Sequence, residues 1–265
     1  MTTFVLVGGA WLGGWAWQPV ARRLRGSGHE VHPVTLTGLG DRSHLARPEV
    51  DLDTYLADVV NLIEVEDLRD VVLVGHSYAG IVVTGVADRV PERLSLLAYL
   101  DAGPSPDGVA FIDSQPPEAR ELLEGLVERD GDGWRLPMPS WEELEGVMGA
   151  SLEGLGPAER ARMRAHAAAQ PFRTWTQPLS LSDNPARQGL AKLLISCSIP
   201  LDQVRDLAAA GHPWFAELAG PQWSFLELPT GHWPMFSRPE PLAALLDRVP
   251  GAVRSRPDRG GPTST

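Results

Sequence analysis

The chain has 265 residues, of which 43% are apolar, and its formal net charge at pH 7 is -11. This length and composition allow one large buried core, and the negative charge argues against a nucleic-acid partner or an anionic membrane surface. No segment is long and apolar enough to cross a membrane and the N-terminus shows no export pattern, so we expect a cytoplasmic protein whose partner is a small molecule.

Short apolar runs alternate with helical patterns along the chain, which is typical of a parallel sheet whose strands are joined by crossover helices. Before the middle of the chain we expect strands at 4–7, 29–36, 71–74 and 94–100, and helices at 15–25, 53–67 and 77–89, with Asp53 as the cap of the second helix. After the middle we expect strands at 193–196 and 223–228, and helices at 201–210 and 240–248. Six parallel strands result.

The alternation is interrupted between about residues 103 and 188, where no strand is expected. Helical stretches at 117–129, 141–152 and 157–169, separated by turns rich in Gly and Pro, predict a helical cap over the site. We therefore divide the chain into a core of residues 1–103 and 189–250, a cap of residues 104–188 and a disordered tail of residues 251–265. The aromatic residues of the cap either pack it onto the core or line a substrate cavity; these are Phe111, Trp134, Trp141, Phe172 and Trp175.

Residues 75–80 read Gly-His-Ser-Tyr-Ala-Gly and stand between an apolar run and a helix-forming stretch. A serine at such a strand-to-helix turn is typical of a nucleophile elbow, in which the hydroxyl is lifted above the edge of the sheet. The small residues on both sides of Ser77 let the backbone turn tightly. We therefore predict that Ser77 is a nucleophile.

The chain resembles the α/β-hydrolase superfamily, and more narrowly the branch that holds plant-type methylesterases and hydroxynitrile lyases. The resemblance rests on Phe-Val-Leu-Val-Gly-Gly-Ala-Trp at 4–11, Gly-Gly-Trp-Ala-Trp at 13–17, Leu-Thr-Gly-Leu-Gly at 36–40, the elbow at 75–80 and Thr-Gly-His at 230–232. It spans nearly the whole core and leaves the cap unaccounted for. It implies an α/β-hydrolase fold, with a six-stranded, mostly parallel sheet flanked by helices and a helical cap insertion, and it leaves the substrate open.

A serine hydroxyl needs a neighbouring base, and His232 is the candidate because it follows the last expected strand and precedes the last helix, where this fold delivers its histidine. His76 lies next to the nucleophile and is expected to point away from Ser77 and to support the elbow. The histidines show no paired spacing and no His-Glu-x-x-His pattern, so we predict no metal site.

The acid of the triad departs from the commonest pattern. In most relatives it follows the strand that corresponds to residues 193–196, but the loop Ser-Cys-Ser-Ile-Pro at 196–200 contains no acid. Asp202 is the nearest substitute, yet a role in the first turn of a helix explains it without catalysis. Asp101 ends the strand beside the elbow strand, at the edge where open α/β sheets place their sites, and some relatives draw their acid from there. We favour Asp101 and keep Asp202 as the alternative; a cap at the entry to the insertion is the structural explanation of Asp101.

Acyl transfer also needs donors for a developing oxyanion, and we expect the backbone N–H groups of Tyr78 and Ala10 to supply them. Gly8 stands where relatives often carry a histidine that braces this loop. Four residues are expected to contact the substrate, with a polar handle supplied by Tyr78 or the cap; they are Trp11, Trp175, Trp233 and Met235.

These observations predict a cofactor-free serine hydrolase, an esterase or lactonase, that acts on a bulky, fairly apolar metabolite. One alternative is a lyase or cyclase of secondary metabolism that uses the same Ser77 and His232 as acid and base groups; a second is a small-molecule-binding scaffold without turnover. Such lyases commonly recruit a lysine, but Lys192, the only lysine, precedes a strand far from its reactive end. The sequence leaves the bond that is cleaved and the oligomeric state open.

Overall fold

The computed structural model describes residues 1–182, 184–210 and 216–254, and it contains a six-stranded sheet in which neighbouring strands are parallel. The strand order is β2-β1-β3-β4-β7-β8, with β3 and β4 buried near the centre. The strands are β1 (Thr3–Val7), β2 (Glu30–Val34), β3 (Val71–His76), β4 (Leu94–Leu100), β7 (Lys192–Ser196) and β8 (Trp223–Glu227). The prediction of six parallel strands in an α/β-hydrolase fold is confirmed.

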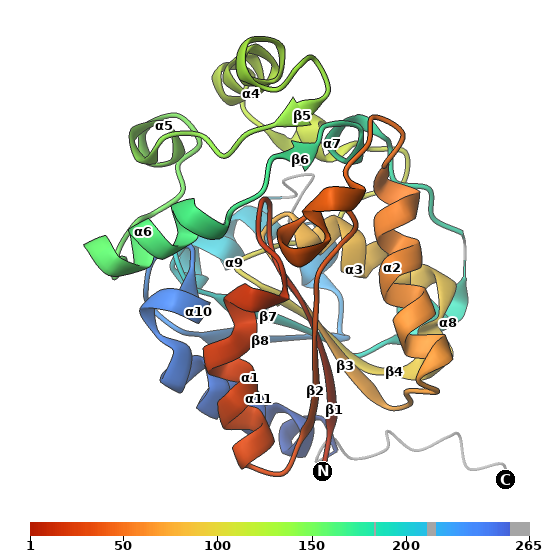
Figure 1. Ribbon diagram of the computed structural model, residues 1–265. Helices are drawn as coiled ribbons and strands as arrows, with labels where there is room; N and C mark the ends of the chain where they lie inside the picture. Colours follow the sequence, from red (N-terminus) through yellow and green to blue (C-terminus); the bar gives the residue numbers. More distant parts are fainter. Residues whose placement is uncertain (183, 211–215, 255–265) are drawn as a thin grey trace, which may run out of the picture.

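Helices cover both faces of the sheet, as strands that read as continuous apolar runs require. Figure 1 shows α1 (Gln18–Gly26) and α11 (Pro239–Arg254) together over one face, and α2 (Leu52–Val65) and α3 (Ala79–Arg89) over the other. Of the other helices, α8 (Pro185–Gly189) lies just before β7, α9 (Leu201–Ala209) follows β7 and α10 (Pro234–Ser237) follows β8. Short 3-10 turns lie at Gly14–Trp17, Gly40–Leu45, Pro91–Arg93 and Ala216–Ala219. Among the described helices, none has the length and apolar character needed to cross a membrane.

The start of α2 differs from the prediction, because Asp51 and not Asp53 is its N-cap. The backbone of Asp51 is extended, and its carboxylate accepts from the Thr54 N–H at 3.0 Å while the Thr54 side chain accepts from the Asp51 N–H. A residue can cap a helix only from outside its first turn. Asp53 lies inside that turn, where it pairs with Arg89.

The long insertion lies between β4 and β7 and sits above the carboxyl edge of the sheet (Figure 1). Its elements are a 3-10 turn at Phe111–Ser114, α4 (Pro117–Asp130), β5 (Arg135–Leu136), α5 (Trp141–Gly146), α6 (Pro157–His166), β6 (Gln170–Pro171) and α7 (Arg173–Thr176). The sequence predicts three of these helices but extends the second to residue 152, and it misses the antiparallel pair of β5 and β6. Strands of two residues are too short to show an alternation.

The division into core and cap stays a proposal. Of the proposed tail at 251–265, residues 251–254 belong to α11, and the rest lies outside the described residues.

The parallel register of β3 and β4 places two candidate site residues side by side. His76 pairs with Leu100, so Ser77 and Asp101 each follow a paired position at the same edge of the sheet. Both have left-handed backbones, with φ of 53° and 45°. Because such φ values are unfavourable for residues with a side chain, these two strand ends carry strain at the site.

Gly80 is required by close packing at the start of α3. A Cβ atom at this position would lie 2.6 Å from the carbonyl oxygen of Gly103. At Gly125 in the cap helix α4, by contrast, the nearest atom within 4 Å is a flexible Arg129 nitrogen at 3.8 Å.

We expect Gly80→Ala to destabilise the protein by about 1–3 kcal/mol, because the backbone at Gly103 must move to admit the methyl group. The matched change Gly125→Ala should be neutral or stabilising by up to about 1 kcal/mol, because alanine favours an open helix position. Thermal and urea unfolding of both variants measure the difference. Equal effects of the two changes would contradict this account of the elbow.

Candidate active site

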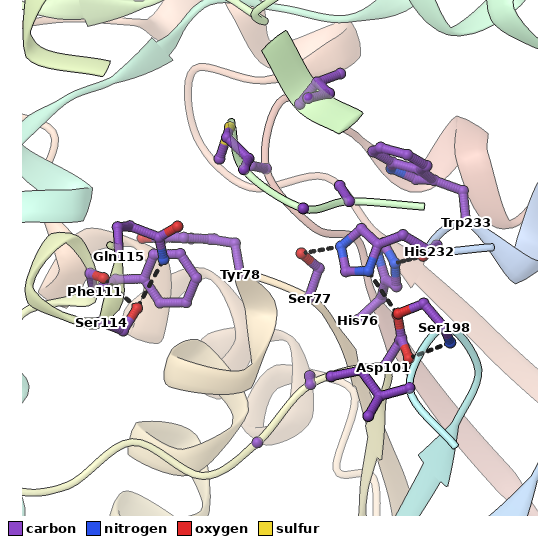
Figure 2. A pocket seen from close by; sticks show the side chains of 18 of the residues that line it. His76, Ser77, Tyr78, Asp101, Phe111, Ser114, Gln115, Ser198, His232 and Trp233 are labelled. Carbon is purple, nitrogen blue, oxygen red and sulfur yellow. Dashed lines mark hydrogen bonds and ion pairs between the residues drawn. The ribbon is translucent and has the colours of Figure 1, made fainter. Parts of the chain in front are cut away.

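Ser77 lies on the turn between β3 and α3. β3 ends at His76, and α3 begins at Ala79 with Tyr78 as its N-cap residue. The left-handed backbone of Ser77 costs about 1–3 kcal/mol and is held by the packing around it. Its hydroxyl therefore stands at the carboxyl edge of the sheet and points toward His232 (Figure 2).

Three side chains that are distant in sequence form one chain of hydrogen bonds. His232 Nε2 lies 2.8 Å from Ser77 Oγ, and His232 Nδ1 lies 2.6 Å from Asp101 Oδ2 (Figure 2). When Nδ1–H donates to the carboxylate, the Nε2 lone pair is free to accept the serine proton. This arrangement has the geometry of an activated serine.

Asp101 is almost fully buried, and the turn after β7 keeps its carboxylate charged. Oδ1 accepts from the N–H groups of Cys197 and Ser198 at 2.9 Å each, and Oδ2 accepts from Ser198 Oγ at 2.6 Å. Burial raises the pKa of Asp101, but the hydrogen bond and charge of His232 and the Ser198 donors outweigh it and lower the pKa to about 2. The loop at 196–200 therefore contributes hydrogen-bond donors to the acid at the end of the neighbouring strand β4, in place of an acid of its own.

The structure does not bring Asp202 to the histidine. Asp202 is exposed in the first turn of α9, where it accepts from the Gln203 N–H at 2.9 Å. Sequence reasoning noted that the loop at 196–200 lacks an acid but missed the role of Ser198. The polar residues of that loop were the available signal.

The backbone of His232 is held from both sides. His76 Nε2–H donates to the His232 carbonyl oxygen at 2.6 Å, and the His232 N–H donates to Ser151 O in the cap at 2.8 Å. Next to it, the Gly231 N–H donates to Glu153 O at 3.2 Å. Burial, followed by the charge of His232, lowers the pKa of His76 to about 3, so this ring stays neutral. His76 supports the histidine loop, whereas the sequence suggested that it supports the elbow.

The predicted oxyanion donors lie beside Ser77. Ala10 and Tyr78 line the cavity, and within the described part of the chain neither of their N–H groups donates to another protein atom. The adjoining Trp11 has φ of 64°, and its N–H donates to Gln170 Oε1 at 3.1 Å. Gln170, a buried residue of β6, thus braces the loop that lacks the usual histidine. A buried glutamine in the cap gave no sequence signal for this role.

A cavity of about 370 Å³ opens above Ser77 and lies between the core and the cap. Trp11, Trp175 and Trp233 line it, as expected for substrate contacts. Met235 does not line it: α10 turns inward after Trp233, and Met235 is fully buried in the core. The Tyr78 hydroxyl is also no free polar handle, because it donates to Thr174 O at 2.7 Å.

We expect Asp101→Asn to lower kcat by about 10³–10⁴-fold, because an amide no longer holds the imidazole in the required tautomer or stabilises its charged form. Asp202→Asn should stay within twofold of the wild type. Steady-state ester hydrolysis by both variants, each checked for an unchanged circular dichroism spectrum, makes the comparison. A larger loss at Asp202 would reverse the assignment of the acid.

We expect Gly231→Ala to lower kcat by about 10–100-fold, because a Cβ there would lie 2.5 Å from Glu153 O and would shift the histidine loop. Gly26→Ala is the matched control, since nothing lies within 4 Å of its added methyl group. Measuring kcat alongside the unfolding midpoint separates misplacement of the base from general destabilisation. An unchanged kcat in Gly231→Ala would show that this backbone contact does not position the base.

Comparison with known proteins agrees with this geometry. A model described as "Alpha/beta hydrolase family" matches residues 4–245. The "Carbendazim hydrolyzing esterase" of Nocardioides sp. (strain SG-4G) is 34% identical over 260 residues and covers 93% of this chain and 98% of its own. "Methylesterase 3" of Arabidopsis thaliana is 27% identical over 255 residues, covering 91% of this chain and 93% of its own.

Among solved structures, an extracellular alpha/beta-hydrolase from a Paenibacillus species has a TM-score of 0.74 at 24% identity, with 93% of this chain and 98% of that chain covered. The resemblance to α/β hydrolases and to methylesterases that the sequence motifs indicated is thereby confirmed. The chain belongs to the alpha/beta hydrolase family and is a hydrolytic enzyme related to esterases.

Proposed function

We propose that the protein is a serine esterase or lactonase in which Ser77, His232 and Asp101 act as nucleophile, base and orienting acid. The observation that carries this proposal is the single imidazole that hydrogen-bonds to a buried carboxylate on one side and to a strained serine hydroxyl on the other. Its substrate is an ester or lactone of a bulky, fairly apolar metabolite.

The proposed reaction begins when Ser77 Oγ attacks the substrate carbonyl carbon while His232 Nε2 takes its proton. The charged Asp101 stabilises the imidazolium, and the N–H groups of Ala10 and Tyr78 donate hydrogen bonds to the carbonyl oxygen as negative charge develops on it. His232 then gives the proton to the leaving alcohol oxygen, which leaves an acyl group on Ser77. Water, deprotonated by the same base, releases the acid and restores the hydroxyl.

The lining of the cavity supports an apolar substrate. Three tryptophans face it, and cap residues Leu144 and Met148 line it further. The relatives named as a carbendazim hydrolyzing esterase and as a methylesterase support an ester as the bond that is cleaved. A lactone fits the same steps, since ring opening keeps the leaving alcohol attached to the acyl group.

The lyase alternative lacks the lysine that such enzymes commonly recruit, since no lysine is present in the described lining of the cavity. Lys192 is buried at the start of β7, pairs with Glu217 at 2.5 Å and does not line the cavity. A small-molecule-binding scaffold would have the same side chains in place, so a measurement of substrate turnover is what separates it from an esterase. Placement in the cytoplasm and in secondary metabolism stays a prediction from the sequence.

We expect a fluorophosphonate to label Ser77, because only a hydroxyl activated by its neighbour attacks such a probe readily. Peptide mass spectrometry should locate the adduct on Ser77, and labelling should fall at least about 100-fold in rate in His232→Ala, which lacks the base. Ser77→Ala should lose hydrolysis of 4-nitrophenyl acetate, whereas Ser27→Ala, at an exposed helix end, should keep it. Turnover that survives in Ser77→Ala would refute the proposed function.

A further inference from the structure

One part of the cavity is built by a continuous segment that neither the triad nor the oxyanion donors use. Residues 102–115 leave the carboxyl end of β4 and run past Tyr78 into the 3-10 turn at Phe111–Ser114. We call the part of the cavity that they form with the neighbouring rings the side lobe. Its lining residues are Tyr78, Ser105, Phe111, Ser114, Gln115 and Trp175.

The rings of the side lobe pack into one aromatic wall. Tyr78 stacks on Trp175 with centroids 5.4 Å apart and an interplanar angle of 22°, and Phe111 makes a T-shaped contact with each of them at a centroid distance of 4.9 Å. The Tyr78 hydroxyl is engaged with Thr174 O, so the wall offers ring carbon to the cavity. Such a wall favours a flat apolar group over a charged or bulky branched one.

A fixed amide stands at the end of this wall. Ser114 Oγ donates to Phe111 O at 2.6 Å and accepts from Gln115 Nε2 at 2.8 Å (Figure 2). These two bonds determine the orientation of the Gln115 side chain, since the serine proton is already given away. The amide therefore keeps its oxygen as an acceptor and its second N–H as a donor.

A second polar group in the lobe lacks a protein partner. Ser105 is only 3% exposed and lines the cavity, and among the described residues its hydroxyl makes no hydrogen bond. A hydroxyl that lines a cavity and has no protein partner is free to donate to and accept from a bound molecule. Apart from the triad, no charged side chain is present in the described lining, so the complementary group is neutral.

We propose that the side lobe binds a flat ring that carries a neutral substituent able both to donate and to accept hydrogen bonds, such as a carboxamide. This inference rests on the proposed esterase function and names its substrate class: esters that carry an aromatic ring with such a polar group at the end of the ring away from the ester. The ring lies along the aromatic wall, and the substituent pairs with Gln115 and Ser105.

The test uses two nearly isosteric substituents. Methyl 3-phenylpropanoates with a para-carboxamide or a para-isopropyl group place the ring on the acyl side, and the acetates of the matching 3-phenylpropanols place it on the alcohol side. We expect the wild type to prefer the carboxamide over the isopropyl ester about tenfold in kcat/KM in at least one of the two series. Tenfold corresponds to about 1.4 kcal/mol, the size of one or two neutral hydrogen bonds.

We expect Gln115→Leu to remove this preference by raising KM for the carboxamide ester about tenfold, while KM for the isopropyl ester, which makes no hydrogen bond to the amide, does not rise. Ser105→Ala should lower the carboxamide preference in kcat/KM by about threefold. Gln188→Leu, the same change at an exposed position of α8 away from the cavity, should leave the preference intact.

Three outcomes would overturn the proposal: a preference unchanged in Gln115→Leu, an equal loss for both substituents, or no carboxamide preference in the wild type in either series. In each of these cases hydrolysis of 4-nitrophenyl acetate that depends on Ser77 would leave the esterase function standing. A wild-type protein that does not hydrolyse 4-nitrophenyl acetate would instead refute the proposed function itself.

Discussion

The hydrogen bond between His232 and the buried carboxylate of Asp101 is the interaction on which the rest of the site depends. A carboxylate in this position would take up a proton if it were left without partners, and it would then no longer stabilise a charged imidazole. The turn at Cys197 and Ser198 prevents this by supplying three donors, while His232 supplies the fourth. The turn therefore keeps the Asp101 carboxylate negatively charged, and this negative charge would stabilise the imidazolium that forms when His232 takes the proton of Ser77.

The position of the acid follows from the parallel register of the sheet. Leu100 of β4 pairs with His76 of β3 on one side and with Ile195 of β7 on the other, so the ends of three adjacent strands meet at one edge. An acid at the end of β4 and an acid in the loop after β7 therefore approach the same imidazole. In this chain the carboxylate follows β4 and its donors follow β7, and the carboxylate reaches the imidazole of His232.

The insertion between β4 and β7 does more than line the cavity, because it also hydrogen-bonds to two loops of the candidate site. Gln170 accepts from the Trp11 N–H in the oxyanion loop, and Ser151 O accepts from the His232 N–H in the loop of the base. Gly231 permits the second contact, since any side chain there would meet the cap backbone. The insertion is thus joined to the backbone beside the candidate reacting groups, and it also supplies Phe111 and Trp175 of the aromatic wall and the fixed amide of the side lobe.

The sequence by itself determined the six strands and singled out Ser77, His232 and Asp101 as candidate site residues, because each depends on a local pattern or on its place at the end of a strand. It placed the N-cap residue of α2 two residues too late and put Met235 at the substrate. It showed neither the Ser198 donors nor the contacts of Gln170 and Ser151. The contacts of Ser198, Gln170 and Ser151 join residues about 80 to 160 positions apart, and each uses a backbone N–H of the kind that every residue except proline carries. Periodicity and short motifs record how a segment folds against itself, whereas only the packed tertiary structure decides which distant carbonyl meets which N–H.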